Sequence, residues 1–352
     1  MQNKYRISIA MATYNGAMYL REQLDSIAQQ ELLPYELVIT DDLSSDSTFD
    51  IVDNFSSTAP FPVRFYRNDK KQGVTENFFR AANLCEGEII AFCDQDDVWL
   101  PGKLARCSEV LENESVLLCI HSAELIDKDN NLIGRKWPHY DTHTVKPSNN
   151  DNLWYDTYPG FSMVFKKKLL YLIPTIKEFG PYLSTMWYHD SYIAFLAVNL
   201  GNVVFLSDIL ALYRQHGQNT CGALPDLLFS EKILKSLDST VKHYDDLARQ
   251  AEEEVVILLS LAPNLSVCAC FNANICAARK RRLGIALKRR SLLYDHKNLF
   301  ESINFFISLL LNGGYCRITK GGLGAKGLIK DFIYNFAPWL IKYFLIINSK
   351  NS

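Results

Sequence analysis

At 352 residues, with 48% hydrophobic and 22% charged residues, the chain is too long for one ordinary domain and can bury a sizeable core. This composition excludes wholesale disorder and a collagen-like or low-complexity protein. The net charge of −2 conceals an asymmetry: residues 279–352 carry 14 Lys and Arg against three Asp and Glu, whereas residues 1–278 carry a net charge of −13. A basic segment of this kind indicates an anionic partner, either nucleic acid or lipid.

The nine cysteines are scattered and form no CxxC pair, which excludes the spacing typical of zinc sites. No basic and apolar leader precedes the first strand pattern, so we expect no signal peptide. Free thiols without a secretion signal predict a protein of the reducing cytosol.

The first 120 residues alternate short apolar runs with helical patterns. Leu20, Leu24 and Ile27, for example, share one face of a predicted helix. Strands alternating with helices predict an α/β fold with a mostly parallel, Rossmann-like sheet covered on both faces. The predicted strands are 7–12, 36–40, 63–66 and 89–93, and the predicted helices are 19–29, 48–55, 75–84 and 103–111.

The middle of the chain is predicted to continue this fold. Extended segments are expected at 116–121 and 202–206, a turn followed by a strand at 158–165, and a helix at 191–200. After Pro225 the pattern is helical nearly throughout. We therefore expect an α/β region over 1–222, with halves 1–115 and 116–222, followed by an α-helical extension over 223–352.

Three predicted strands end in polar turns. The first ends at residues 13–16, the second at 41–46 and the fourth at 94–97. Ligands of parallel α/β sheets bind outside the carboxyl ends of the strands. The sequence therefore predicts a polar binding edge where these three turns meet.

The strongest local signal is the acidic segment after the fourth strand. Three clustered carboxylates repel one another unless a counter-charge is present, and a divalent cation such as Mg²⁺ or Mn²⁺ would supply it. Asp96 is the expected direct ligand, and Asp94 is expected at the ribose or a metal-bound water. Asp97 and Trp99 are expected to hold the loop. The alternative is a solvated acidic turn that starts the next helix.

Two residues suit recognition of a nucleotide base. Asp42 could accept the imide N–H of a uracil or thymine ring, although it could equally form a turn or helix cap. Tyr14 offers a ring face on which a base could stack, with ordinary packing as the alternative.

Two later segments carry groups for proton and charge chemistry. Asp190, which follows His189, could be a general base that removes a proton from an acceptor hydroxyl, or simply an N-terminal helix cap. Arg214 could meet a diphosphate and His216 could complete a metal shell. An exposed loop is the alternative for both of these residues.

Taken together, these segments resemble the inverting family-two glycosyltransferases with the A-type glycosyltransferase fold. The chain is similar to bacterial enzymes of O-antigen and capsular polysaccharide assembly, including rhamnosyltransferases. The resemblance covers about residues 5–222, and Leu43 departs from it because many members carry Gly there. It rests on the segments 9–16, 40–48, 94–96, 158–165, 189–190 and 213–217.

The resemblance implies roles for individual residues. For donor nucleotide binding these are Ala12, Thr13, Tyr14, Asn15, Asp42, Asp94 and Arg214. For acceptor binding they are Gly160, Phe161 and His189, and for metal binding they are Asp94, Asp96 and His216, with Mn²⁺ or Mg²⁺ as the cofactor. Asp190 would be the catalytic base.

The implied activity is transfer of a sugar, with inversion, from a dTDP-rhamnose or UDP-hexose donor to a glycan or lipid-linked acceptor. The pathway would be cell-surface polysaccharide synthesis. The departing diphosphate would be neutralised by a metal held by Asp96, while Asp190 deprotonates the acceptor hydroxyl. Residues 1–222 would be the catalytic domain, with a nucleotide-binding half (1–115) and an acceptor half (116–222).

The C-terminal third predicts contact with a membrane surface. Basic clusters at 279–282 and 288–290 precede uncharged apolar runs at 303–311 and 332–341. Both runs are shorter than the roughly 20 residues of a transmembrane helix. They fit helices lying on anionic lipid, and thus a peripheral protein on the cytoplasmic face of the inner membrane. The alternative is a helical cap with a solvated basic face. Nucleic acid is not expected, because no nucleic-acid-binding motif is present.

Two other functions compete with the transferase. A nucleotidyltransferase would need a glycine-rich basic loop after the first strand, which residues 13–18 lack. A non-catalytic sugar-nucleotide or glycan-binding module would bind a donor without turnover, and the joint presence of Asp96 and Asp190 disfavours it.

Overall fold

A computed structural model describes residues 5–146, 158–217, 219, 241–261, 273–295, 299–316 and 322–336. The chain divides into two compact units. The first comprises Met1–Pro174, Met186–Leu224 and Cys268–Phe271, and the second comprises Thr175–Thr185, Pro225–Val267 and Asn272–Ser352. The predicted domain boundary at residue 222 lies outside the described residues and stays a prediction.

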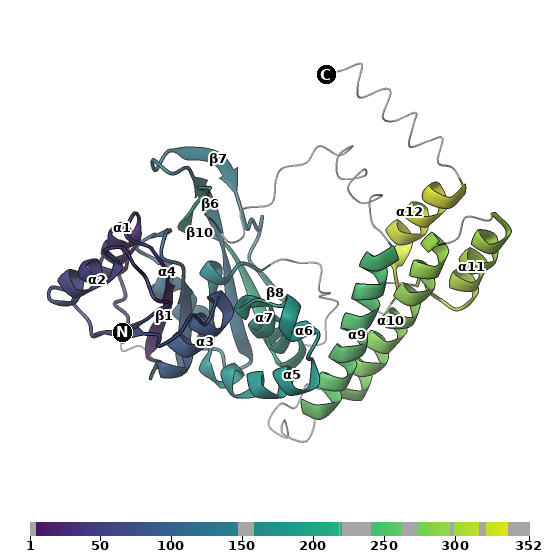
Figure 1. Cartoon of the computed structure of the whole chain (residues 1–352), viewed down its shortest axis with the longest axis horizontal. Coiled ribbons are helices and arrows are strands. Elements are labelled where there is room, and N and C mark those ends of the chain that lie inside the picture. Colours follow the sequence, from purple (N-terminus) through teal and green to yellow (C-terminus); the bar gives the residue numbers. More distant parts are fainter. Residues whose placement is uncertain are drawn as a thin grey trace, which may run out of the picture. The chain divides into compact units, whose positions relative to one another are not determined.

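The first unit is built on one sheet of ten described strands (Figure 1). Their order is β3-β2-β1-β4-β9-β6-β10-β5, with β7 paired to β6 and β8 paired to β10. The strands are β1 (Ile7–Thr13), β2 (Glu36–Asp41), β3 (Val63–Arg67), β4 (Ile89–Cys93), β5 (Val98–Trp99), β6 (Val116–Ile126), β7 (Leu132–Lys136), β8 (Thr144–Lys146), β9 (Met163–Lys166) and β10 (Asn202–Arg214).

The predicted mostly parallel sheet is confirmed. Strands β3, β2, β1 and β4 pair in parallel, as do β6 and β10. Strand β9 runs antiparallel between β4 and β6, and β5, β7 and β8 pair antiparallel at the edges. Because β2, β1 and β4 are neighbours, the three polar turns predicted from the sequence follow adjacent strands.

Strands β6 and β10 are longer than predicted, and β6 ends at Ile126 instead of His121. Strand β10 continues past the expected end at Leu206 because the ladder with β6 shifts register between Leu206 and Ala211. Such a bulge accommodates the polar residues that interrupt the apolar run and lets pairing resume. It brings Arg214 to the same sheet edge as the acidic segment after β4.

Helices cover both faces of the sheet. The described helices of this unit are α1 (Leu20–Ala28), α2 (Thr48–Ser56), α3 (Val74–Leu84), α4 (Lys103–Leu111) and α7 (His189–Leu200), together with the 3-10 helix η2 (Lys167–Leu172) after β9. Most of α5 (Ile173–Phe179) and of α6 (Leu183–Met186) belongs to the second unit. Helices α1, α2 and α4 supply apolar residues to one core cluster. On the opposite side, Phe78 of α3 packs against Phe92, and Phe79 against Tyr192 of α7.

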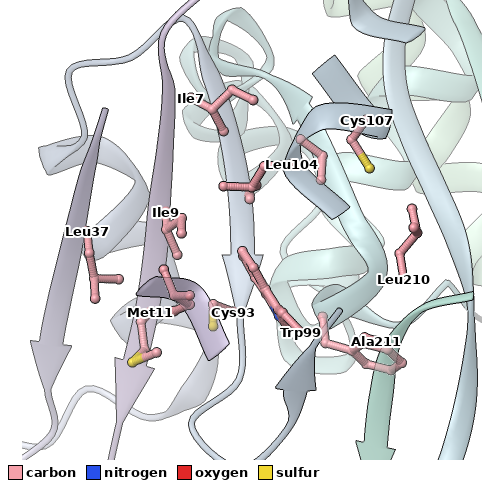
Figure 2. Close-up of a cluster of buried hydrophobic side chains, with 14 of the residues drawn as sticks. Ile7, Ile9, Met11, Leu37, Cys93, Trp99, Leu104, Cys107, Leu210 and Ala211 are labelled. Carbon is pink, nitrogen blue, oxygen red and sulfur yellow. The ribbon is translucent and has the colours of Figure 1, made fainter. Parts of the chain in front are cut away.

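The core that supports the site lies between the sheet and helices α1 and α4. Ile9, Met11 and Cys93 are fully buried on β1 and β4, and Leu24 and Leu104 meet them from the two helices. Figure 2 shows this packing reaching Trp99 and Ala211 of the β5–β10 pair. Each fully buried Leu or Ile contributes about 1.5–3 kcal/mol, so the strand ends rest on a stable base.

The second unit is helical in the part that the structure describes. It contains α9 (Val241–Leu261), α10 (Ala273–Asp295), α11 (Leu299–Leu311) and α12 (Gly324–Phe336). A Cβ atom at Gly284 of α10 would lie 3.4 Å from the Cβ of Ala251 of α9, so these two helices pack closely. None of the described helices combines the length and hydrophobicity needed to cross a bilayer.

Candidate active site

The turns after β1 and β2 are bound tightly to each other. The backbone N–H of Asn15 donates to Ser44 Oγ at 2.8 Å, and that of Gly16 donates to Thr48 Oγ1 at 2.9 Å. In return, the Asn15 side-chain oxygen accepts the Ser45 N–H at 2.9 Å. Several polar groups of the predicted donor-binding turn are therefore used internally, and they fix its shape.

Other donor-side residues lie on this frame. Thr13 is buried and donates through its hydroxyl to Asp41 at 3.0 Å. Ala12, one residue earlier on β1, is half-buried. Leu43 has a backbone φ of +65°, which is the left-handed conformation that favours glycine. The turn after β2 is thus formed by a leucine in a conformation that glycine adopts more easily.

Asp42 directly follows β2 and faces the segment before α3. Its Oδ1 accepts the Gln72 N–H at 2.6 Å and the Asn68 amide at 2.9 Å, and its Oδ2 accepts the Gly73 N–H at 2.9 Å. Burial alone would raise the pKa of Asp42, but these hydrogen bonds and nearby Lys71 together lower it. Asp42 is therefore ionised, and three of its roughly four acceptor positions are occupied.

Tyr14 is exposed beside this carboxylate, with 45% of its surface accessible. Lys71 Nζ lies 4.1 Å from the centre of its ring and 2.5 Å from its hydroxyl. The ring is therefore oriented by a cation while half of its surface faces solvent. Sequence reasoning missed Lys71, because a single Lys in a polar loop carries no distinctive pattern.

The acidic loop, Asp94–Asp97, is connected to the β1 turn through Gln95. The Gln95 side chain accepts the Tyr14 N–H at 3.0 Å and donates to the Tyr14 carbonyl at 3.1 Å. Beyond it, Asp96 Oδ2 lies 2.8 Å from His216 Nε2. The structure therefore brings together Asp96 and His216, two of the three residues predicted to bind metal.

Carboxylates converge at this loop. Burial, followed by the charges of Asp96 and Asp190, raises the pKa of Asp94 to about 7. The influence of both charges indicates that Asp94, Asp96 and Asp190 share one site. Burial and the neighbouring Asp96 and Asp94 also raise the pKa of Asp97 well above its ordinary value.

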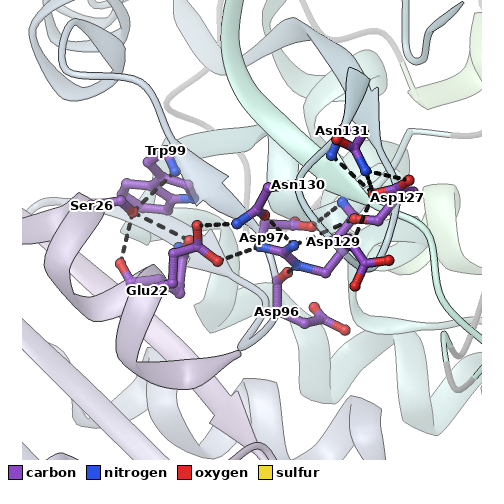
Figure 3. Close-up of polar contacts among 11 residues, drawn as sticks. Glu22, Ser26, Asp96, Asp97, Trp99, Asp127, Asp129, Asn130 and Asn131 are labelled. Atoms are coloured by element: carbon purple, nitrogen blue, oxygen red, sulfur yellow. Dashed lines mark hydrogen bonds and ion pairs between the residues drawn. The ribbon is translucent and has the colours of Figure 1, made fainter. Parts of the chain in front are cut away.

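Arg214 has a different position from the one predicted. Its guanidinium is buried, and it donates to the Asp96 carbonyl at 2.8 Å, to Glu22 Oε2 at 2.7 Å and to Asn130. Figure 3 shows Glu22, Asp96 and Asn130 gathered around this position. The Arg214 N–H also donates to Asp97 Oδ1 at 3.0 Å. These contacts give Arg214 the role of fastening the end of β10 to the acidic loop, and they do not favour direct contact with a diphosphate.

Asp190 lies in the first turn of α7 and is held by its neighbours. Its Oδ1 accepts the Ser191 N–H at 2.7 Å, and the backbone N–H of Gly160 also acts on it. Burial raises the pKa of Asp190 to about 6. A carboxylate of this kind can accept a proton near neutral pH.

The residues predicted to bind the acceptor pack around Asp190. The His189 ring is stacked on Phe78 at 3.9 Å, and a Cβ at Gly160 would lie 2.5 Å from His189 Nε2. Burial lowers the pKa of His189 to about 3, and neither of its ring nitrogens has a hydrogen-bond partner among the described residues. Phe161 is buried and stacks on Tyr213 at 4.4 Å. These buried residues are therefore better placed to shape the surroundings of Asp190 than to contact an acceptor directly.

The predicted three-ligand metal site is only partly assembled. Asp96 and His216 are in contact, and Asp94 acts on the same site through its charge. Within the described ranges, no group of three or more His, Cys, Asp or Glu side chains is arranged to hold a metal ion by itself.

Comparison with known proteins identifies the first unit. Residues 8–172 match the model of glycosyl transferase family 2. The chain carries a family 2 glycosyltransferase domain. This domain contains β1 to β9, and therefore the turns after β1 and β2 and the acidic loop after β4.

Curated relatives align with parts of the chain. An uncharacterized glycosyltransferase of Nostoc sp. is 29% identical over 61% of this chain and 66% of its own length. The dTDP-rhamnosyl transferase RfbG of Shigella flexneri is 35% identical over 29% of this chain and 36% of its own length. A GalNAc(5)-diNAcBac-PP-undecaprenol beta-1,3-glucosyltransferase of Campylobacter jejuni is 29% identical over 52% of this chain and 58% of its own length. The chain thus spans between about a third and two thirds of these relatives.

Among solved structures, S. aureus TarS in complex with UDP-GlcNAc matches with a TM-score of 0.50 and 16% identity. The match covers 89% of this chain and 93% of that chain. At this identity the likeness concerns the fold, and it agrees with the predicted A-type glycosyltransferase fold.

Proposed function

We propose that this protein transfers a sugar from a nucleotide diphosphate donor, dTDP-rhamnose or a UDP-hexose, to a glycan or lipid-linked acceptor with inversion. The observation that carries the proposal is the contact of Asp96, in the acidic loop, with His216, together with the charges of Asp96 and Asp190 that both raise the pKa of the buried Asp94. Relatives named as a dTDP-rhamnosyl transferase and an undecaprenol-linked glucosyltransferase support the donor and acceptor classes. Both fit synthesis of a cell-surface polysaccharide such as O-antigen or capsule.

The donor nucleotide would lie on the frame formed by the β1 and β2 turns. The free acceptor position of Asp42 would receive the imide N–H of the base, and the exposed part of Tyr14 would stack on the ring. Lys71, which is exposed beside Tyr14, is placed to meet a phosphate of the donor.

The acidic loop suits a divalent cation. Asp94 and Asp96 offer carboxylate oxygens and His216 offers an imidazole, ligands that fit Mn²⁺ or Mg²⁺. Among the described residues, no complete set of three protein ligands surrounds this position. Mg²⁺ and Mn²⁺ commonly complete their coordination with substrate phosphates and water, so a partial set of protein ligands suits them. When bound, the cation would supply positive charge that stabilises the departing diphosphate.

Asp190 would act as the general base. Its raised pKa gives it enough basicity to take a proton from an acceptor hydroxyl, while leaving it ionised at neutral pH. The attacking oxygen would approach the anomeric carbon opposite the departing diphosphate, so a single displacement inverts the configuration. General-base assistance of this kind typically contributes about 10²–10⁴-fold to the rate.

The helical unit would place the protein on an anionic membrane surface, on the cytoplasmic face of the inner membrane. Phe300, Ile307 and Leu311 of α11 are exposed on one helix, and Arg281 and Arg282 are exposed on α10. Apolar and basic side chains of this kind fit an interfacial site on anionic lipid. A lipid-linked acceptor would be presented at the same surface.

The function is tested with a panel of nucleotide sugars and purified protein. Wild type with Mn²⁺ should release the nucleoside diphosphate from one donor, whereas Asp96→Ala should lose about 10³-fold or more of that activity, because removing a group that stabilises charge commonly costs several kcal/mol. Asp141→Asn, which changes an exposed carboxylate whose ion-pair partner is His139, is the matched control.

Two outcomes would refute the transferase. If Asp96→Ala keeps the turnover of wild type and the same requirement for metal, the acidic loop has no role in the reaction. Donor binding by wild type without turnover on any acceptor would favour the sugar-nucleotide-binding module instead.

A further inference from the structure

A lysine is buried directly beneath the site. Lys103, the first residue of α4, is fully buried. Lysine side chains are almost never fully buried unless a partner offsets the charge. The partners of Lys103 therefore indicate what its charge does.

The two direct contacts of the Lys103 ammonium are uncharged. Nζ donates to the backbone carbonyl of Phe161 at 2.7 Å and lies 3.6 Å from the centre of the Trp99 ring. Phe161 belongs to the 3-10 helix η1 (Gly160–Ser162), and Trp99 belongs to β5, which follows the acidic loop. Lys103 thus contacts segments on both sides of the candidate site.

The charge of Lys103 acts on the acidic loop. Burial and neighbouring carboxylates raise the pKa of Asp94 and of Asp97, whereas Lys103 acts in the opposite direction on both. Burial in turn lowers the pKa of Lys103 to about 8, and Asp97 and Asp94 are among the groups that oppose this shift. Asp97 Oδ1 accepts the Arg214 N–H, whereas Asp97 Oδ2 is buried with no hydrogen-bond partner among the described residues.

The contact with Phe161 extends to the proposed base. Gly160, next to Phe161, directs its N–H toward the Asp190 carboxylate and leaves no room for a side chain beside His189. A shift of η1 would therefore move the surroundings of Asp190. The lysine connects the position of this turn to the charge of the acidic loop.

We propose that Lys103 is a positioning residue: its ammonium fixes the Phe161 turn and supplies the internal positive charge that lets the buried carboxylates of the acidic loop lie side by side. The first part rests on the proposed function, since it concerns the acceptor side of the reaction. The second part concerns charge in the folded protein and does not depend on activity.

The charge is tested by a double-mutant cycle on thermal unfolding of the full-length protein. Lys103→Met keeps the length of the side chain and removes the ammonium, so the melting temperature should fall by several degrees. Asp97→Asn keeps the oxygen that accepts the Arg214 N–H and removes the unpaired charge. The double variant should melt several degrees above Lys103→Met alone. If the losses in melting temperature of the two single variants simply add in the double variant, Lys103 does not act as a counter-charge for Asp97.

The positioning is tested by steady-state kinetics with donor and acceptor varied separately. Lys103→Met should lower kcat/KM for the acceptor by about 10–100-fold, as expected for a small displacement of reacting groups. Lys103→Arg, which keeps the charge, should recover part of the loss.

The matched control is Leu104→Ala, which opens a cavity at the neighbouring buried position of the same helix and keeps the Lys103 ammonium. Leu104→Ala should lower the melting temperature by at least as much as Lys103→Met, yet keep the kinetic constants of wild type. Equal kinetic losses in both variants would assign Lys103 to packing alone. A wild-type protein without transferase activity would refute the proposed function and leave the unfolding result standing.

Discussion

Asp42 and Asp190 are both carboxylates at the edge of the sheet, but their pKa values move in opposite directions. Hydrogen bonds from Gln72, Asn68 and Gly73 outweigh burial at Asp42, whereas burial outweighs the bonds from Ser191 at Asp190. The balance between burial and the hydrogen bonds and charges around each carboxylate therefore decides its basicity. Asp42 suits recognition in the ionised form, and Asp190 suits proton transfer.

The raised pKa of Asp190 predicts a pH dependence. The base must be ionised to accept a proton, so kcat should rise between pH 5 and 7, with a midpoint near the pKa of about 6, and then level off. The measurement is kcat against pH at saturating donor and acceptor. Asp190→Asn should retain only a small activity without this limb, and a flat wild-type profile over the same range would exclude Asp190 as the base.

The same shift has a consequence for stability. The pKa of Asp190 is higher in the folded state than in the unfolded chain, so ionisation costs stability as the pH rises from 3.8 to about 6. Asp190→Asn should therefore melt at a higher temperature than wild type at pH 8, while the two should differ less at pH 4. A lower melting temperature for the variant at pH 8 would contradict this assignment.

The turn after β2 contains a strained residue, and this predicts unequal effects of two substitutions at Leu43. A non-glycine residue with a φ of +65° costs about 1–2 kcal/mol. Leu43→Gly relieves this strain and should stay within about 1 kcal/mol of wild type, whereas Leu43→Val, with a branched Cβ, should destabilise by more than 1 kcal/mol. Urea unfolding measures both free energies. Equal losses in the two variants would mean that side-chain contacts, and not the backbone, decide this position.

At the scale of elements, the site depends on how closely η1 and α7 approach each other. Their contact point is Gly160, where the absent side chain leaves room for the buried His189 ring. His189 is itself held between Phe78 and Phe92, so it cannot yield easily. The positions of the turn and the helix are therefore coupled.

This coupling predicts the effect of Gly160→Ala. The new methyl group would lie 2.5 Å from His189 Nε2, so η1 or α7 must shift, at a cost of about 1–3 kcal/mol. Because Asp190 follows His189, kcat should fall by about 10-fold or more, while donor affinity changes little. Gly102→Ala, whose added Cβ would have its nearest neighbour at 3.9 Å, is the control and should match wild type. Unaltered kinetics in Gly160→Ala would show that this approach does not position the base.

At the scale of the whole molecule, the helical unit should be tested by surface substitutions and not by truncation. Removing residues after about 278 would delete most of α10, which packs against α9. Leu258 of α9 and Leu287 of α10 are both fully buried. The loss of this packing would unfold the unit and obscure any effect on membranes. Substitutions of exposed residues avoid this problem.

The membrane proposal predicts two separable losses in vesicle sedimentation. Ile307→Ser with Leu311→Ser removes exposed apolar surface from α11 and should weaken binding to vesicles containing phosphatidylglycerol by about 10-fold. Arg281→Gln with Arg282→Gln should weaken it similarly and reduce its salt dependence, at about 1 kcal/mol per charge. Leu132→Ser, at an exposed position on β7, is the control. Wild-type protein that stays in the supernatant with anionic vesicles would refute membrane binding.

Much of the fold could be predicted because its signals are local. The runs at 7–12 and 89–93 and the stripe of Leu20, Leu24 and Ile27 lie within single elements, and each element forms where its periodicity places it. Strand β5 has only two residues, and β7 lacks an alternating pattern, so neither could be predicted. The bulge in β10 depends on pairing with β6, which no local pattern records.

The sequence by itself determined which residue types gather at the sheet edge, because the carboxyl ends of adjacent parallel strands must meet. It placed Asp42 and Asp96 at this edge for this reason, whereas Asp190 and His216 were predicted from their own segments. Only the tertiary structure decided what each side chain does there, because burial and hydrogen-bond partners come from segments distant in the chain. Arg214 is enclosed by Glu22 and Asn130, and Lys103 is turned inward toward Phe161. Charge in a protein acts through its three-dimensional surroundings, and the linear order of residues does not specify them.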